Sequence, residues 1–338
     1  MKRSVGLLVV ASIVCFAVGA SAQKSLPLKR LQTVPLPDVK EGDFDHFTID
    51  LAGKRLFLTA EDNNTVEVFD TGTNKLIRTL HEVKAPHAMV YFPDSKQLWV
   101  VSGGDGALKI FDTNTYALAD TIKLTPAADS AGYDAAKHLL YVASGGDDAK
   151  MEYSLIDIVD TNARKRVGEI KVDSTNIEAM AIEKNGPKLF ANVRDKNVVG
   201  VIDREKKTVL TTWTLGDVKS NTPMAFDEAS HRLFIVGRKP PTLVVLDAET
   251  GKIVATLPTG PLADDAIFDP QGKLIYVACN GFTAVYIERD PDHYEELARV
   301  PTGYRARTAI LVPELKRYYT AASRNKEKPA ELEVYEVQ

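Results

Sequence analysis

The sequence predicts an all-β chain that folds as a seven-bladed β-propeller of four-stranded antiparallel blades. Three observations predict this fold: a motif that occurs seven times, a strand-like segment before each copy, and chain ends that complement each other. Repetition at a period of about 40 residues is typical of propellers. It outweighs the two domains that a chain of 338 residues would otherwise suggest.

The repeated motif is a pair of apolar residues closed by an acidic residue, and its copies lie 41 to 48 residues apart. The copies are Val68-Phe69-Asp70, Ile110-Phe111-Asp112, Ile158-Val159-Asp160, Val201-Ile202-Asp203, Val245-Leu246-Asp247, Tyr286-Ile287-Glu288 and Val334-Tyr335-Glu336. Turn residues follow the acidic residue in most copies, as in Thr71-Gly72 after Asp70. An Asp that opens a turn accepts hydrogen bonds from backbone amides. We therefore interpret the repeated acidic residue as structural.

A segment rich in aromatic and β-branched residues precedes each copy by about one strand. Leu56-Phe57-Leu58 and Leu98-Trp99-Val100 are two examples. Such residues favour buried strands. Turn residues divide every unit into four short strands, and no amphipathic helical segment interrupts the series. Four strands in each of seven units are typical of a propeller.

The two ends of the chain complement each other. The last unit stops after its third strand, at Val337-Gln338, whereas residues 31–35 match the fourth strands of other units. Pairing them closes the ring and hides two sheet edges. We predict one domain over 23–338, with blades at about 44–80, 85–124, 128–172, 176–215, 221–259, 263–302, and 305–338 together with 28–37.

Residues 1–22 are predicted to be a cleavable signal peptide. Lys2 and Arg3 precede an apolar stretch, and Ala20-Ser21-Ala22 supplies a cleavage site of small residues before Gln23. The apolar stretch, residues 5–18, is shorter than the about 20 residues that a membrane-spanning helix needs. We therefore expect a periplasmic or secreted protein with no membrane span.

Charge and cysteine content restrict the partners. Cleavage removes Lys2 and Arg3 and lowers the formal net charge from −4 to −6, which argues against a nucleic-acid partner. Only Cys279 then remains, so no internal disulfide can form. We expect a monomer whose core alone stabilises it.

The repeat resembles that of the YVTN, or YncE-like, family of exported β-propeller repeat proteins. The strand that names the family is approximated by Tyr141-Val142-Ala143-Ser144 and by Tyr276-Val277-Ala278-Cys279-Asn280. The resemblance covers the whole mature chain and implies an exported scaffold. It implies no site residue, because this repeat carries no shared catalytic motif.

Alignment of the seven units brings mostly polar residues to the mouth of the channel. The first strand of each blade lines the channel of a propeller, and the loops between second and third strands open at the same end. The first strands contribute His46, His87, Ser130, Glu178, Thr222, Asp265 and Arg307. The loops add Glu61, Asp105, Asp147, Arg194, Arg238, Asn280 and Arg324.

Two histidines and a carboxylate in this region favour a divalent metal. We predict His46, His87 and Asp129 as its ligands, with Asp45 beside them. Imidazole and carboxylate together suit zinc or another divalent transition metal, and such a metal is the possible cofactor. The alternative is a water-filled channel, in which polar side chains are tolerated without a ligand.

The remaining charged residues predict a site for a small anionic ligand. This predicted set is Glu178, Arg194, Arg238, Asp265, Arg307 and Arg324. The arginine fork suits carboxylate and phosphate groups. We therefore expect an exported binding or scaffold protein that holds a small anionic ligand, a metal or a protein partner.

The alternative function is a metal-assisted hydrolase, such as a lactonase, with its site at the channel mouth. It rests on analogy between folds. The chain contains no Gly-x-Ser-x-Gly nucleophile elbow and no His-Glu-x-x-His zinc motif. A propeller can still assemble a site from residues scattered over its blades, so both interpretations stay open at this point.

Overall fold

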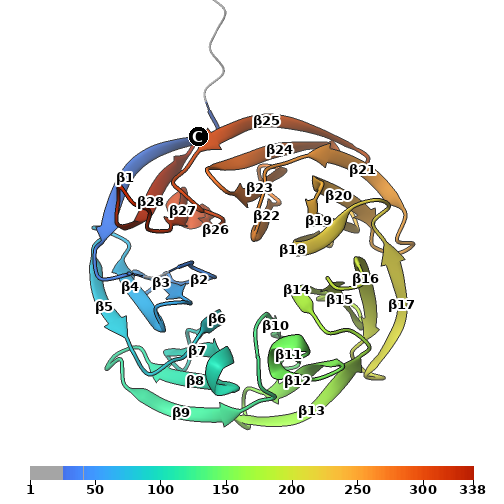
Figure 1. Ribbon diagram of the computed structural model, residues 1–338, viewed down its shortest axis with the longest axis horizontal. Coiled ribbons are helices and arrows are strands. Elements are labelled where there is room, and N and C mark those ends of the chain that lie inside the picture. The colour runs from blue at the N-terminus through green and yellow to red at the C-terminus, as the bar shows by residue number, and fades with distance from the viewer. Residues whose placement is uncertain (1–25, 41) are drawn as a thin grey trace, which may run out of the picture.

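The structure, a computed structural model, describes residues 26–40 and 42–338, and the predicted signal peptide lies outside them. The described chain forms seven four-stranded antiparallel sheets arranged as a ring around a central channel (Figure 1). This confirms the predicted fold class. The helices of this part of the chain are three single 3₁₀ turns, η1 (Gly103–Asp105), η2 (Asp147–Ala149) and η3 (Pro313–Leu315). None of the described helices has the length and apolar character needed to cross a membrane.

The first four blades follow one another along the chain. Blade 1 contains β2 (Phe47–Asp50), β3 (Arg55–Ala60), β4 (Thr65–Asp70) and β5 (Leu76–Leu80). Blade 2 contains β6 (Pro86–Phe92), β7 (Gln97–Ser102), β8 (Ala107–Asp112) and β9 (Leu118–Lys123). Blade 3 contains β10 (Ala131–Asp134), β11 (Leu139–Gly145), β12 (Ser154–Asp160) and β13 (Lys165–Val172). Blade 4 contains β14 (Ile177–Ile182), β15 (Lys188–Val193), β16 (Val198–Asp203) and β17 (Thr208–Thr214).

The last three blades complete the ring. Blade 5 contains β18 (Lys219–Asp227), β19 (Arg232–Lys239), β20 (Pro241–Asp247) and β21 (Ile253–Pro258). Blade 6 contains β22 (Asp265–Asp269), β23 (Leu274–Cys279), β24 (Phe282–Asp290) and β25 (His293–Pro301). Blade 7 contains β26 (Thr308–Val312), β27 (Arg317–Ala322), β28 (Ala330–Val337) and β1 (Leu28–Leu36). The first strand of each blade is innermost (Figure 1).

The core lies between neighbouring blades. Leu56 and Phe69 of blade 1, for example, are buried in one cluster with Tyr319 and Val334 of blade 7. Successive side chains of a strand point to opposite faces of its sheet. Because a blade packs on each face, the second and third strands are buried along most of their length, as in β3 and β4.

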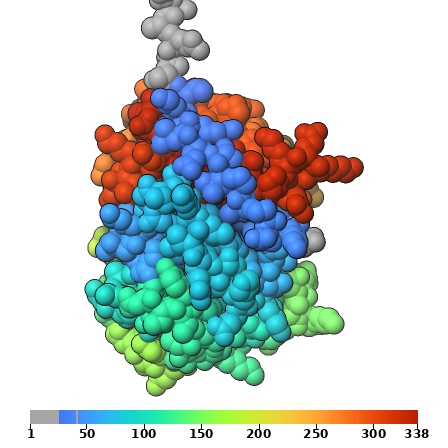
Figure 2. All heavy atoms as spheres, turned by 90° about the vertical axis from the view of Figure 1, so that its left-hand side faces the viewer, coloured from blue at the N-terminus to red at the C-terminus, as the bar shows by residue number. Residues whose placement is uncertain are grey.

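The N-terminal strand closes the ring. β1 pairs antiparallel with β28, from Leu28 opposite Val337 to Leu36 opposite Ala330. Figure 2 shows this N-terminal segment, in blue, lying against the C-terminal blade, in red. The predicted ring closure is therefore confirmed.

The five aspartates of the repeated motif are turn residues, as the sequence indicates, whereas Glu288 and Glu336 lie within β24 and β28. Asp70 Oδ1 accepts a hydrogen bond from the Thr73 amide at 2.8 Å, and Asp247 Oδ1 accepts one from the Thr250 amide at 2.8 Å. Asp112 makes the same contact with the Thr115 amide at 2.9 Å. These carboxylates stabilise the turns between the third and fourth strands, which supports a structural role for them.

Candidate functional site

A cavity of about 470 Å³ lies at one mouth of the central channel, where the seven first strands converge. This convergence brings side chains together that lie about 40 residues apart in the sequence. Of the predicted site residues, the cavity wall contains all but Arg324, namely His46, His87, Asp129, Glu178, Arg194, Arg238, Asp265 and Arg307. Arg324 lies exposed on the loop between β27 and β28, outside the lining of the cavity.

Asp45, His87 and Asp129 form a compact group at blades 1, 2 and 3, which we call the triad. One ligand atom from each residue can be chosen so that all three atoms lie within 4.8 Å of one another. His87 Nδ1 is 2.9 Å from Asp45 Oδ2 and 3.4 Å from Asp129 Oδ1. His87 is in β6, whereas the two aspartates lie in the segments that lead into β2 and β10.

His46 lies next to the triad but has a different main partner. Its Nδ1 is 3.4 Å from Asp265 Oδ1 of blade 6, and its Nε2 is 3.9 Å from Asp45 Oδ2. Asp45 therefore takes the place in the compact group that the sequence analysis assigned to His46. The two residues are adjacent in sequence, and the repeat alignment placed channel positions only to within one residue.

Opposite charges in a confined space shift the pKa values of the triad. Burial lowers the pKa of His87, but the carboxylates of Asp129 and Asp45 outweigh it and raise the pKa to about 10. Burial, together with the charge of Asp45, raises the pKa of Asp129 to about 7. Burial also opposes ionisation of Asp45, but His46 and the hydrogen bond with His87 hold its pKa well below the usual range. Without a bound metal, His87 and Asp45 thus form an ion pair at neutral pH.

The three arginines of the cavity wall are paired with carboxylates. Arg194 Nη1 is 2.6 Å from Glu178 Oε1, and Arg238 Nη2 is 2.5 Å from Asp264 Oδ1. These pairs neutralise guanidinium groups that the sequence analysis assigned to an anionic ligand. Asp264 was not among the predicted residues, although it directly precedes Asp265 and so leads into an inner strand.

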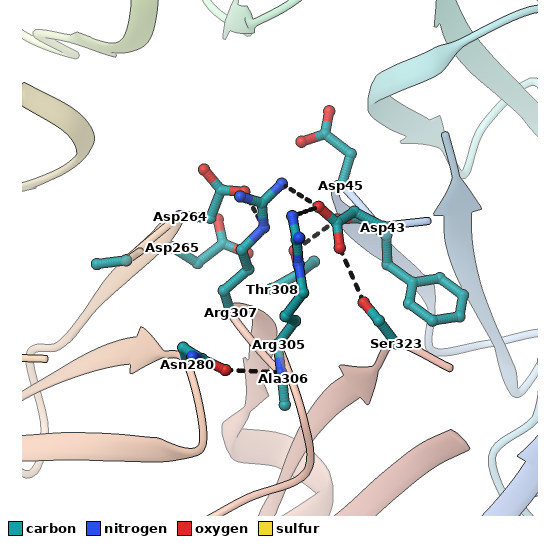
Figure 3. Close-up of polar contacts among 12 residues, drawn as sticks. Asp43, Asp45, Asp264, Asp265, Asn280, Arg305, Ala306, Arg307, Thr308 and Ser323 are labelled. Atoms are coloured by element: carbon teal, nitrogen blue, oxygen red, sulfur yellow. Dashed lines mark hydrogen bonds and ion pairs between the residues drawn. The ribbon is translucent and has the colours of Figure 1, made fainter. Parts of the chain in front are cut away.

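Arg307 contacts two carboxylates, one in the segment that leads into blade 6 and one just before blade 1. Its Nε is 3.0 Å from Asp264 Oδ2, and its Nη2 is 2.9 Å from Asp43 Oδ2. Figure 3 shows that Asp43 is also bound by Arg305 and by Ser323, whose hydroxyl donates at 2.9 Å. Asp43 lies just before blade 1, whereas its partners belong to blade 7. This network therefore links the ends of the ring beside the cavity.

Two carboxylates of the wall, Glu61 and Asp148, complete the acidic side of the cavity. Both lie in loops between second and third strands, on blades 1 and 3. Burial raises the pKa of Glu61 to about 6. A carboxyl group with such a pKa can take up and release a proton near neutral pH.

Two solved structures share this architecture. A chain of the crystal structure of the mitotic checkpoint complex superimposes with a TM-score of 0.76 at 18% identity, over 99% of each chain. A chain of hydrazine synthase from Kuenenia stuttgartiensis gives a TM-score of 0.74 at 18% identity, over 96% of this chain and 100% of that one. At this identity the likeness shows the fold alone, a β-propeller. No protein-family model and no curated protein sequence matches the chain.

Proposed function

We propose that this protein is an exported binding protein that holds a divalent transition-metal ion at the mouth of its channel. The ligands are Asp45, His87 and Asp129, and the observation that carries the proposal is the approach of their ligand atoms to within 4.8 Å of one another. One imidazole and two carboxylates suit zinc and other divalent metals of the first transition row. Three protein ligands leave coordination positions that water or a small anionic ligand can fill from the cavity.

Zinc is expected to bind the metal-free protein, and His87→Ala is expected to lower the affinity by about 100-fold or more, because it removes the one imidazole of the triad. Asp45→Asn should act in the same direction. His46→Ala should have a smaller effect, because His46 contacts Asp265 more closely than it contacts Asp45. Isothermal titration calorimetry near pH 8, on protein without affinity histidines, measures these affinities.

His293→Ala is the matched control. His293 is exposed and contacts Asp290 in the turn between β24 and β25, so its loss should leave zinc affinity unchanged. Circular dichroism would verify that every variant is folded. A parent protein that binds no zinc, or a His87→Ala variant that binds it as tightly as the parent, would rule out the proposal.

We also propose export of this protein to the periplasm or the medium, supported by the charged, apolar and small-residue segments of 1–22 and by the YVTN-like repeat. N-terminal sequencing of exported protein is expected to begin at Gln23. Exported protein that still begins with Met1 would contradict cleavage. A protein partner on the same charged face is compatible with the fold, since one of the similar propellers is a chain of a protein complex.

A metal-assisted hydrolase of the lactonase type is the second candidate function. The observation that favours it is Glu61, whose pKa of about 6 and place in the cavity wall suit proton transfer beside a metal. Turnover of a lactone by the zinc-loaded protein distinguishes the two functions. A binding protein would retain the metal and leave the lactone intact.

A further inference from the structure

Residues 43–46 lie just before β2 and include Asp45, one of the three proposed metal ligands. Hydrogen bonds attach the end of this segment to β3 of the same blade. The Asp45 amide donates to the Thr59 carbonyl oxygen at 3.1 Å, and the His46 amide donates to Thr59 Oγ1 at 2.8 Å. These bonds fix the segment within blade 1, and its position relative to blade 7 depends on the residues before Asp45.

Asp43 attaches the segment to blade 7. Its carboxylate is bound by Arg305, by Arg307 at 2.9 Å and by Ser323, whose hydroxyl donates at 2.9 Å (Figure 3). The Asp43 side chain is 9% exposed, so solvent weakens these charge-assisted hydrogen bonds only a little. Three donors of blade 7 therefore converge on one carboxylate that lies two residues before a proposed ligand.

Phe44, the residue between Asp43 and Asp45, contacts the same blade. The Thr308 hydroxyl donates to the Phe44 carbonyl oxygen at 3.0 Å. Phe44 is also buried in the core cluster that blades 1 and 7 share. Since both residues before Asp45 are attached to blade 7, the Asp45 backbone can move relative to the channel only if these contacts stretch or break.

A movement of the Asp45 backbone would act directly on the triad. Asp45 Oδ2 lies 2.9 Å from His87 Nδ1, and the third ligand, Asp129, comes from yet another blade. Bonds from zinc to oxygen or nitrogen are about 2.0 to 2.2 Å long and tolerate only about 0.2 Å of variation. Three ligands from three blades therefore meet these distances only if each is held accurately in place.

We propose that Asp43 is a positioning residue for the metal site, which holds Asp45 in place across the closure of the ring. Asp43 is not itself a ligand, because the donors of blade 7 occupy its carboxylate. The inference rests on the proposed function, since it requires Asp45 to bind the metal. By linkage, zinc bound to Asp45 stabilises the contact between blades 1 and 7 in return.

The test is the zinc affinity of the mature chain, measured by competition with a chelator at about pH 8, at a temperature at which circular dichroism shows every variant to be folded. Asp43→Asn and Asp43→Ala are expected to lower zinc affinity about tenfold or more, as loss of a group that orients a metal ligand typically does. Asp43→Glu restores a carboxylate and should bind zinc more tightly than Asp43→Ala. Zinc should also raise the melting temperature of Asp43→Asn by less than that of the parent.

Asp134→Asn is the matched control. Asp134 is a buried carboxylate that also pairs with an arginine of the neighbouring blade, Arg204, but it lies outside the cavity wall. This variant should melt at a lower temperature than the parent and bind zinc equally well. A comparable loss of zinc affinity in Asp134→Asn would assign the effect to general destabilisation and overturn the inference.

The remaining outcomes separate this inference from the proposed function. A folded Asp43→Asn variant that binds zinc as tightly as the parent, while Asp45→Asn binds it weakly, would overturn the positioning role and leave the proposed function in place. An Asp43→Glu variant that binds zinc no better than Asp43→Ala would also count against the role of the carboxylate. A parent that binds no zinc would reject the proposed function and this inference with it.

Discussion

Deleting residues 28–36 is expected to unfold the whole propeller, although none of them lines the cavity. The deletion removes β1, the fourth strand of blade 7, and exposes the unpaired edge of β28. It also removes Leu28 and Leu36, which are each 1% exposed and belong to the clusters between blade 7 and its two neighbours. Loss of two such leucines alone should lower the melting temperature by about 10 °C or more.

Thermal melting followed by circular dichroism measures this effect. The double variant Thr33→Pro/Val34→Pro should also lower the melting temperature. The backbone amides of adjacent strand residues point to opposite edges of the strand, so one of the two prolines removes an amide that donates a hydrogen bond to β28. Removal of residues 23–26, which precede β1, is the control and should leave melting unchanged. A protein without residues 28–36 that melts like the parent would show that strand pairing is not what closes the ring.

Zinc affinity is expected to rise steeply with pH, and to continue rising above neutral pH. Metal binding requires neutral His87, whose pKa is raised to about 10, so a proton competes with zinc throughout the neutral range. Each pH unit below about 10 should therefore cost about tenfold in affinity. Below about pH 7, Asp129 also takes up a proton and the dependence should become steeper. An unperturbed histidine would instead give a plateau above about pH 6.5.

Competition with a zinc chelator at roughly pH 6.5, 7.5 and 8.5 measures this slope, and about a hundredfold gain is expected over the range. Calorimetry in two buffers of different ionisation enthalpy should report about one proton released per zinc bound near pH 8. His87→Ala, whose zinc binding is weaker, should lose most of the slope. A plateau above pH 7 in the parent would contradict either the raised pKa of His87 or its role as a ligand.

Much of the architecture could be predicted because the repeat is local. Each motif contains its own strand residues and turn residues, so seven copies predict seven blades without any knowledge of distant contacts. The closing strand was predictable for the same reason, since residues 31–35 carry the pattern of a fourth strand. The observed strand, Leu28–Leu36, lies within the predicted closing segment 28–37. The alignment of the units also brought most of the predicted site residues to one cavity, because equivalent positions converge at the axis of a propeller.

The contacts within the cavity could not be read from the repeat. Successive residues near a strand point in different directions, so an alignment accurate to one residue could not choose between Asp45 and His46.

The sequence by itself determined the number of blades, their strands and the end of the channel at which charged residues gather. Only the tertiary structure decided which charges meet. Arg307 and Asp43 are 264 residues apart and contact at 2.9 Å, whereas Arg324, predicted for the same site, lies outside the cavity. The physical reason is that ion pairs between blades depend on the stagger and side-chain direction of neighbouring sheets. The period of the repeat encodes neither of these.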